Sequence, residues 1–177
     1  MASAVLKAVE AFLRTPKLLI KGDPVDYYRY LGDDVIEGEH GGFKDDSKPL
    51  WLNLGYWKDA RTYPEAAAAM ARRLGEAAEL GPGDKQLDVG FGFAEQDVFW
   101  VTEMGVSHIT GVNITPMQAE RAQKRMQARG LSDRIDLRVC SATELPFGDG
   151  SFDKITALEC AHHFDTREAF FREAFRV

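Results

Sequence analysis

Two adjacent histidines are the side chains best suited to acid–base chemistry in this chain of 177 residues. His162 and His163 follow an apolar segment at 152–158, and Glu159 lies just before them. An imidazole titrates near neutral pH, so it can remove a proton from a nucleophile. Adjacent side chains diverge on an extended chain, and the other two histidines are distant in the sequence, so we expect no metal site.

A pair of glycines forms the second candidate. Gly90 and Gly92 follow Asp88 at the end of a short apolar stretch, and such a pair permits a tight turn and close approach of a ligand to the backbone. Glu95 and Asp97 come next, and two carboxylates in the first turn of a helix would repel a phosphate. The pattern favours a cation that carries an amino acid, such as S-adenosylmethionine, with Asp88 near its ammonium group. The alternative is that the glycines only turn the chain and the carboxylates only stabilise a helix.

Polar side chains follow the next two apolar stretches. Asn113 can both accept from and donate to a ribose hydroxyl, although an acid is more usual at such a place. Gln118 is equally well explained as the partner of Thr115 in a helix capping box. Ser141 and Thr143 suit either a helix cap or a contact with an adenine edge.

Strands and helices alternate over the second half of the chain, and this alternation predicts a doubly wound, mostly parallel α/β sheet. Ligands bind at the carboxyl ends of the strands in such sheets, so the candidate residues should meet at one edge. We expect an N-terminal segment, 1–63, with a helix at 1–20 and a lid at 21–63, and an α/β domain at 64–177. The expected strands are 85–90, 108–113, 135–140 and 152–158, and the expected helices are 64–80, 95–104, 115–130 and one that begins after Thr166.

The charge balance disfavours nucleic acid as a partner. Lys and Arg number 22 against 28 Asp and Glu, which gives a net charge of −6, and 45% of the residues are hydrophobic. This composition is typical of a soluble globular domain without a general attraction to polyanions. The basic pairs Arg72-Arg73 and Lys124-Arg125 are interpreted as solvated helix faces.

The sequence predicts neither a membrane helix nor a secretory signal. No apolar run approaches the roughly 20 residues that a membrane helix needs. The two cysteines, Cys140 and Cys160, are interpreted as free buried thiols, which favours a cytoplasmic location.

Several segments together resemble the class I S-adenosylmethionine-dependent methyltransferases over residues 51–177. DVGFG at 88–92 resembles their first motif, and LPFGDGSFD at 145–153 is similar to their LPF-x-D-x-SFD segment. WLNLGYW at 51–57, DVGFG and LECAHHF at 158–164 are most similar to natural-product O-methyltransferases of the macrolide-sugar type. The run from Tyr28 to Trp57 also resembles the cyclopropane fatty acid synthase relatives, in which a tyrosine and a GYW segment close over the cofactor.

The resemblance implies a Rossmann-like fold and S-adenosylmethionine as the cofactor, with His163 as the base, because His162 matches an often apolar position. Tyr56 and Trp57 would cover the sulfonium, where an electron-rich ring suits a cation. The glycine pair with Glu159 and Cys160 would line the methionine end, and the residues after the second and third strands would hold the ribose and adenine. The implied cofactor-binding residues are Tyr28, Tyr56, Trp57, Asp88, Gly90, Phe91, Gly92, Asn113, Ile114, Gln118, Ser141, Ala142, Thr143, Glu159 and Cys160.

Three departures from the family pattern stand out. Ala94 replaces the usual third glycine and Asn113 the usual acid, and the resemblance implies that both changes mark a subfamily. The family fold has seven strands and this sequence supplies four, so we expect a truncated record, a fragment, or half of a swapped or split assembly. A sheet that ends at its fourth strand exposes an edge. Self-association through that edge or through the lid is therefore left open.

The expected function is methyl transfer to a hydroxyl of a small natural-product acceptor. Three alternatives stay open at this point. They are C-methylation of a small molecule or lipid, a cofactor-binding module without activity, and a nicotinamide dehydrogenase, against which Glu95 beside the glycine pair argues.

Overall fold

The computed structural model describes residues 45–177. The chain divides into two compact units, Met1–Asp45 and Asp46–Val177, and the second unit carries the candidate residues at 46–177. The expected helix at 1–20, the expected lid residues up to 44 and Tyr28 lie outside the described residues.

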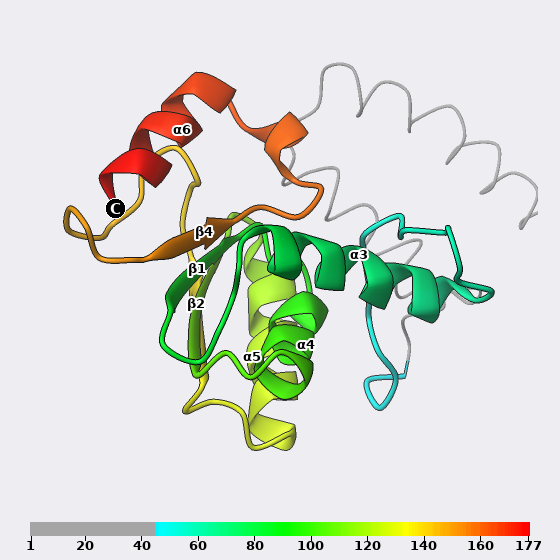
Figure 1. The fold of residues 1–177 in the computed structure, drawn as a ribbon. Helices are drawn as coiled ribbons and strands as arrows, with labels where there is room; N and C mark the ends of the chain where they lie inside the picture. The colour runs from blue at the N-terminus through cyan, green and yellow to red at the C-terminus, as the bar shows by residue number, and fades with distance from the viewer. Residues whose placement is uncertain (1–44) are drawn as a thin grey trace, which may run out of the picture. The chain divides into compact units, whose positions relative to one another are not determined.

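The second unit is built on a sheet of four parallel strands in the order β3-β2-β1-β4 (Figure 1). The strand order reverses beside β1, where β2 lies on one side and β4 on the other, and a doubly wound sheet opens its ligand crevice at such a reversal. The predicted doubly wound parallel sheet is therefore confirmed. The strands are β1 (Lys85–Val89), β2 (His108–Asn113), β3 (Ile135–Val139) and β4 (Lys154–Thr156).

Helices cover both faces of this sheet. A core of buried apolar side chains from α3, α4 and α5, which includes Trp100 and Met126, packs on one face, and a second core around Phe170 of α6 packs on the other. Figure 1 shows α6 on the opposite side of the strands from α4 and α5. None of the helices within residues 45–177 is long and apolar enough to cross a membrane. Their bounds are α3 (Tyr63–Ala77), α4 (Glu95–Glu103), α5 (Pro116–Ala128) and α6 (Arg167–Arg176), with a 3-10 turn, η2, at Ala161–His163.

The helix starts follow from local sequence. Thr62 and Glu65 form a capping box that begins α3, since the Thr62 hydroxyl accepts from Glu65 N–H and the Glu65 carboxylate accepts from Thr62 N–H. Thr166 caps α6 as expected, because its hydroxyl accepts from the Ala169 N–H at 3.2 Å. The sequence predictions of these two helices are confirmed at their N-terminal ends.

Several elements are shorter than expected, and hydrogen bonds account for two of them. Helix α3 ends at Ala77, because Glu79 adopts a left-handed conformation with φ of 52° and the Leu80 N–H donates back to the Gly75 carbonyl. Strand β4 spans Lys154–Thr156 instead of 152–158, because the Phe152 N–H donates to the carbonyl of Val177 at the end of α6. The hydrogen bond that would extend the strand is therefore used to hold the last helix.

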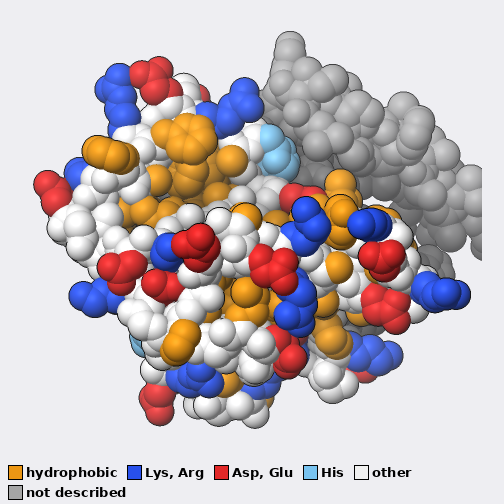
Figure 2. Space-filling view, in the orientation of Figure 1, with side chains coloured by type: hydrophobic (Ala, Val, Ile, Leu, Met, Phe, Trp, Pro, Cys, Tyr) orange, Lys and Arg blue, Asp and Glu red, His pale blue; other side chains and the backbone are white. Residues whose placement is uncertain are grey.

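Helix α6 leaves part of its apolar side chains uncovered. Phe171 and Phe175 are 64% and 96% exposed, while Phe170 is buried. Figure 2 shows hydrophobic side chains gathered where α6 lies, and acidic and basic side chains interspersed over the rest of this face.

Candidate functional site

The turn after β1 is tight and contains three residues with a left-handed backbone conformation. We call this turn, residues 90–94, the glycine hairpin. Gly90, Gly92 and Ala94 have φ of 78°, 58° and 60°. The Gly90 N–H donates to the Val112 carbonyl at 2.7 Å, which continues the β1–β2 pairing to the edge of the sheet. Ala94 occupies the place of the usual third glycine at a conformational cost of about 1–2 kcal/mol.

Close packing within the chain accounts for both glycines. A Cβ on Gly90 would lie 2.6 Å from the Cβ of Cys160, and a Cβ on Gly92 would lie 2.7 Å from Cδ1 of Leu52. The hairpin therefore touches the loop after β4 on one side and the segment before α3 on the other. The space beside each glycine, where a Cβ would lie, is therefore occupied by another side chain of the protein.

Asp88, two residues before Gly90, is fixed by side-chain hydrogen bonds. Its side chain is fully buried, and its two oxygens accept from Gln96 Nε2 at 3.0 Å and from Thr156 Oγ1 at 2.8 Å. Burial raises the pKa of Asp88 to about 7, against the lowering effect of these hydrogen bonds. The expected contact of Asp88 with a ligand's ammonium group does not fit this buried position.

The charges expected to repel a phosphate are not free to do so. Glu95 is buried and forms ion pairs with Arg125 at 2.6 Å and Arg129 at 2.8 Å. Asp97 is fully buried, and neither of its oxygens has a hydrogen-bond partner among the described residues. Burial and then the neighbouring Asp88 raise the pKa of Asp97 well above its ordinary value. The preference for a ligand without phosphate therefore does not follow from these two carboxyl groups.

Asn113, at the end of β2, connects that strand to the hairpin. Its amide nitrogen donates to Gln118 Oε1 at 2.9 Å and to the Gly92 carbonyl at 3.5 Å. The predicted capping box of Thr115 and Gln118 is wrong, because the Thr115 side chain makes no cap bond and Gln118 turns to Asn113. Within residues 45–177, Thr115 Oγ1 and Gln118 Nε2 are buried without a hydrogen-bond partner, while Ile114, just before Thr115, is 44% exposed.

The residues after β3 form a turn stabilised by hydroxyl groups. Ser141 Oγ lies 2.9 Å from Thr143 Oγ1 and accepts from the Thr143 N–H at 3.2 Å, and Ala142 between them is buried. No helix begins here in the described structure, so the interpretation of Ser141 or Thr143 as a helix cap is wrong.

The loop after β4 brings a carboxylate and a thiol to the hairpin. Glu159 is exposed, has φ of 52°, and accepts from the Leu54 N–H at 2.7 Å. The Cys160 thiol donates to the Val89 carbonyl at 2.9 Å, and burial raises its pKa, so the group stays a neutral thiol.

The two histidines follow in the 3-10 turn η2. Their ring centroids lie 3.9 Å apart, so the expectation that adjacent side chains diverge is wrong here, because the chain is coiled rather than extended. Burial, and then the neighbouring His162, lower the pKa of His163. A neutral imidazole at neutral pH is the form that a general base requires. No group of three or more His, Cys, Asp or Glu side chains suited to a metal occurs in the part of the chain that the structure describes.

The aromatic residues expected over the cofactor, Tyr56 and Trp57, lie in the loop that precedes α3. Trp57 is 52% exposed, and its indole N–H donates to the Leu54 carbonyl at 2.8 Å. The ring of Tyr56 faces the guanidinium of Arg73 at 4.5 Å. The Tyr63 hydroxyl, which the sequence analysis did not single out, donates to the carbonyls of Trp51 and Asn53 at 2.9 Å each. The tyrosine therefore holds the chain just ahead of the two aromatic residues.

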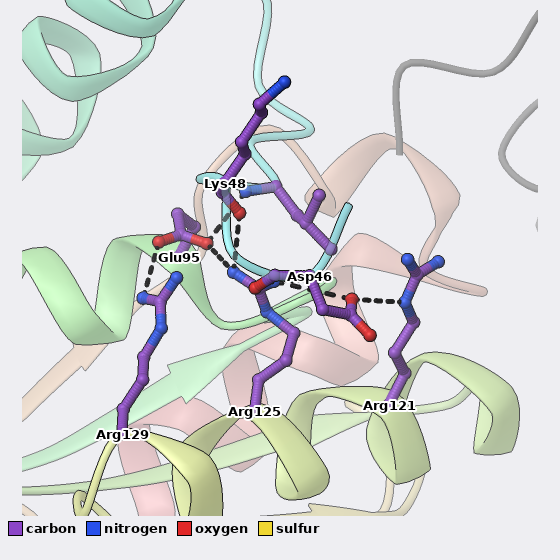
Figure 3. A network of polar contacts seen from close by, with 7 residues as sticks. Asp46, Lys48, Glu95, Arg121, Arg125 and Arg129 are labelled. Carbon is purple, nitrogen blue, oxygen red and sulfur yellow. Dashed lines mark hydrogen bonds and ion pairs between the residues drawn. The ribbon is translucent and has the colours of Figure 1, made fainter. Parts of the chain in front are cut away.

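The sequence did not predict that arginines of α5 form ion pairs with Glu95 and Asp46. Arg125 was interpreted as part of a solvated helix face, but it is 3% exposed and points at the N-terminus of α4 (Figure 3). Arg121, Arg125 and Arg129 are spaced by four residues, which places them on one face of α5. This four-residue spacing is the sequence signal that indicates a shared helix face.

Comparison with known proteins places this geometry in a family. The family described as "Methyltransferase domain" matches residues 87–177, slightly more than half of the chain. Erythromycin 3''-O-methyltransferase of Saccharopolyspora erythraea is 41% identical over 140 residues, which cover 76% of this chain and 46% of that protein. The 27-O-demethylrifamycin SV methyltransferase of Amycolatopsis mediterranei is 37% identical over 142 residues, covering 78% of this chain and 52% of the relative. The chain thus spans about half the length of these curated relatives.

Solved structures agree with the observed topology. The [4+2]-cyclase SpnF superimposes with a TM-score of 0.69 at 27% identity, covering 74% of this chain and 48% of that one. A geranyl diphosphate C-methyltransferase from Streptomyces coelicolor A3(2) has a TM-score of 0.64 at 20% identity, over 75% of this chain and 56% of the other, and shares the fold. Motifs, topology and family match agree: this chain belongs to the methyltransferase domain family, and the family expected from its sequence is confirmed.

Proposed function

We propose that the chain binds S-adenosylmethionine at the carboxyl ends of its four strands and transfers the methyl group to a hydroxyl of a small natural-product acceptor. The observation that carries this proposal is the contact between Gly90 and Cys160, which joins the glycine hairpin to the loop that leads to His163. A cofactor site and a general base are thereby held at one edge of the sheet, beside the strand-order reversal.

The side chains at this edge fit a nucleoside that carries a sulfonium and an ammonium group. Thr115 Oγ1 and Gln118 Nε2 lack partners among the described residues, and ribose hydroxyls can donate and accept. Glu159 is an exposed carboxylate next to the hairpin and suits a cation better than the buried Asp88. The half-exposed ring of Trp57 offers a π face to the same charge.

The chemistry then requires only one proton transfer from the protein. The bound cofactor supplies a methyl group that is electrophilic because it is attached to a positively charged sulfur. His163 takes the proton of the acceptor hydroxyl, and the acceptor oxygen bonds to the methyl carbon as the carbon–sulfur bond breaks. The bonding electron pair stays on sulfur, so the leaving group is a neutral thioether that needs no acid. The remaining acceleration comes from holding acceptor and methyl group in line.

The acceptor class rests on the relatives. Two of them are named for erythromycin and demethylrifamycin SV, so a hydroxylated natural product of that kind is the first acceptor to test. A structural neighbour is named a [4+2]-cyclase, so the fold by itself does not settle the reaction. Cytoplasmic location and self-association stay predictions from the sequence.

The test combines binding with product analysis. Calorimetry should show saturable binding of S-adenosylmethionine and of S-adenosylhomocysteine, and none of NADH. A methyl-labelled donor with a panel of hydroxylated macrolides should then give an O-methyl product. Binding without transfer to any acceptor would favour a cofactor-binding module, a carbon-bound methyl would favour C-methylation, and binding of NADH alone would favour a dehydrogenase.

A further inference from the structure

A short segment contacts the glycine hairpin and is bonded to several residues around it. We call residues 46–54 the strap. In its middle, Leu52 lies against Gly92, where a Cβ on the glycine would come within 2.7 Å of the leucine. At its C-terminal end the Leu54 N–H donates to Glu159, the exposed carboxylate beside the hairpin. The strap therefore contacts two parts of the proposed cofactor site.

The other end of the strap is held by a buried arginine of α5. Arg125 Nη1 donates to the Asp46 carbonyl at 2.6 Å, and Nη2 donates to the Lys48 carbonyl at 3.1 Å (Figure 3). Nη2 also donates to Glu95 Oε2 at 2.6 Å, and that same oxygen accepts from the Leu50 N–H at 2.8 Å. The ion pair thus bonds three backbone groups of the strap, at the alternate residues Asp46, Lys48 and Leu50.

Glu95 connects this network to the hairpin. It is the first residue of α4 and directly follows Ala94, the last residue of the hairpin. Its second oxygen, Oε1, accepts from Arg129 at 2.8 Å, and Arg121 donates to the Asp46 side chain at 2.9 Å. One ion pair therefore fixes both the exit of the hairpin and the strap that lies across it.

The energetics favour a role in positioning. A buried ion pair contributes little net stability compared with apolar side chains of the same size, because both charges lose their water. Arg125 is 3% exposed and Glu95 is 5% exposed, so this cost applies to both. What the pair adds is geometry, since a planar guanidinium can bond two carbonyls and a carboxylate at once and a lysine ammonium cannot reproduce that fork.

We propose that Arg125 and Glu95 are positioning residues for cofactor binding: they hold the strap on the glycine hairpin, so that Leu52 packs on Gly92 and Leu54 orients the Glu159 carboxylate. This inference rests on the proposed function, because it assigns the strap to the same cofactor site. Neither residue touches the cofactor in this account, and both act through the strap backbone.

The test compares two arginines that bond backbone carbonyls in different places. Arg125→Lys replaces the guanidinium that bonds two strap carbonyls and Glu95 with an ammonium group that cannot make the same three bonds. Arg134→Lys is the matched control, because Arg134 donates to the carbonyls of Val101, Val106 and Ser107 and touches no strap residue in the bonds described. Both variants are made in the full chain, and two readouts are taken: the Kd of S-adenosylmethionine by calorimetry, and amide hydrogen exchange of the strap and of β2.

We expect Arg125→Lys to weaken S-adenosylmethionine binding by about tenfold or more, as loss of hydrogen bonds from a charged donor implies. The Leu50 and Leu54 amides should exchange faster by a similar factor, while β2 amides keep their protection. Arg134→Lys should leave both the Kd and strap exchange within about twofold of the wild type.

A second variant keeps the inference testable if Arg125→Lys does not fold. Leu52→Ala removes the contact with Gly92 and leaves the ion pair intact. It should weaken cofactor binding and expose the Leu54 amide, while the Leu50 amide stays protected by Glu95. Unchanged affinity in the folded Arg125→Lys chain or in Leu52→Ala would overturn the inference, whatever the exchange shows. A wild-type chain that binds no S-adenosylmethionine would instead contradict the proposed function itself.

Discussion

Two carboxyl groups next to the glycine hairpin form no ion pair with any of residues 45–177. Asp88 and Asp97 are both fully buried, and Asp97 has no hydrogen-bond partner among the described residues. An ionised carboxylate is costly in such a place, so the protonated form is favoured. The folded chain therefore keeps protons here that an unfolded chain releases near the ordinary Asp pKa of 3.8.

This difference gives stability a defined dependence on pH. The folded pKa of Asp88 is about 7, above its value in the unfolded chain, so the folded state binds more protons between these values. The free energy of unfolding should therefore fall as the pH rises from about 4 to about 7. Asp97→Asn should flatten that slope and stabilise the protein near pH 7.5 by on the order of 1–3 kcal/mol. Denaturant unfolding at pH 5 and pH 7.5 measures both quantities.

An exposed carboxyl group provides the control for that prediction. Asp133 is exposed, so Asp133→Asn removes a carboxyl group without changing the buried pair, and it is measured beside Asp97→Asn. A slope that is equally steep in Asp97→Asn and the wild type would show that Asp97 does not hold a proton in the folded state.

In the proposed mechanism His163 takes the proton of the acceptor hydroxyl, so its removal should affect turnover alone. His163→Ala should lower turnover by about 10²–10⁴-fold, the usual contribution of a general base, while the Kd of S-adenosylmethionine stays the same. Steady-state kinetics and calorimetry on the same preparation measure the two effects. Turnover equal to that of the wild type would remove His163 from this role.

The pH profile tests the same residue in a second way. Burial and His162 lower the pKa of His163, so the acid limb of kcat/KM should have its midpoint below the ordinary imidazole value of 6.5. Because His162→Ala removes the second cause, the midpoint should move to higher pH in that variant. A midpoint that stays in place would mean that another group controls the acid limb.

At the scale of elements, the hairpin and the loop after β4 depend on each other's shape. Gly90→Ala must accept a left-handed φ of 78° and a Cβ 2.6 Å from Cys160. We expect a loss of stability of about 2–4 kcal/mol, from the backbone conformation and overpacking together. Cofactor binding should weaken as well, because the loop with Glu159 has to shift. Thermal unfolding and calorimetry measure the two effects.

The matched control for that prediction is a glycine in open space. Gly130 has φ of 67°, and a Cβ there would meet nothing within 4 Å. Gly130→Ala should therefore lose only the backbone contribution, about 1–2 kcal/mol, and keep cofactor affinity. Equal losses in the two variants would show that the contact between Gly90 and Cys160 contributes nothing.

Most of the elements could be predicted because their signals are local. Alternating apolar residues, the Thr166 cap and the proline that opens α5 lie next to the elements that they define. The length of β4 could not be predicted, since it depends on a hydrogen bond between Phe152 and Val177 at the two ends of a long stretch of chain. Tertiary contacts therefore set the boundaries that the sequence pattern left open.

Part of the candidate site could be predicted from the sequence, and part could not. The hairpin, Asn113 and the loop after β4 follow strands directly, so their shared position at one edge follows from the parallel sheet. The burial of Asp88 and of Arg125 did not follow, because neither charge has a sequence neighbour that pairs with it. Glu95 is 30 residues from Arg125, and only the fold brings them together.

In the whole unit, the sheet separates two apolar cores, and the proposed site lies at the carboxyl ends of its strands. Trp100 belongs to the core on the face of α4 and α5, and Phe170 belongs to the core on the face of α6. The first core includes Phe91 and Ala94 of the glycine hairpin, so the ring of Phe91 is buried in the core and does not line a ligand site as the sequence predicted. The hairpin is also held by the strap, Asn113 and Cys160. Ligand binding at the hairpin should therefore stabilise the whole unit through elements from both faces.

That coupling predicts a shift in thermal stability. At a concentration 100 times the Kd, a ligand that binds only the folded chain adds about 2.7 kcal/mol to the free energy of unfolding. S-Adenosylhomocysteine should therefore raise the Tm by several degrees, whereas NADH should leave it in place. A Tm that is insensitive to S-adenosylhomocysteine at millimolar concentration would contradict tight binding to the folded state.

The position of the bound cofactor is tested most directly by mapping amide chemical shifts during titration with S-adenosylmethionine. We predict that the largest shifts fall on the glycine hairpin, on Asn113 and on Glu159 with Cys160, and that they saturate together with one Kd. Shifts that gather on the exposed face of α6, or no saturable shifts at all, would contradict the claim.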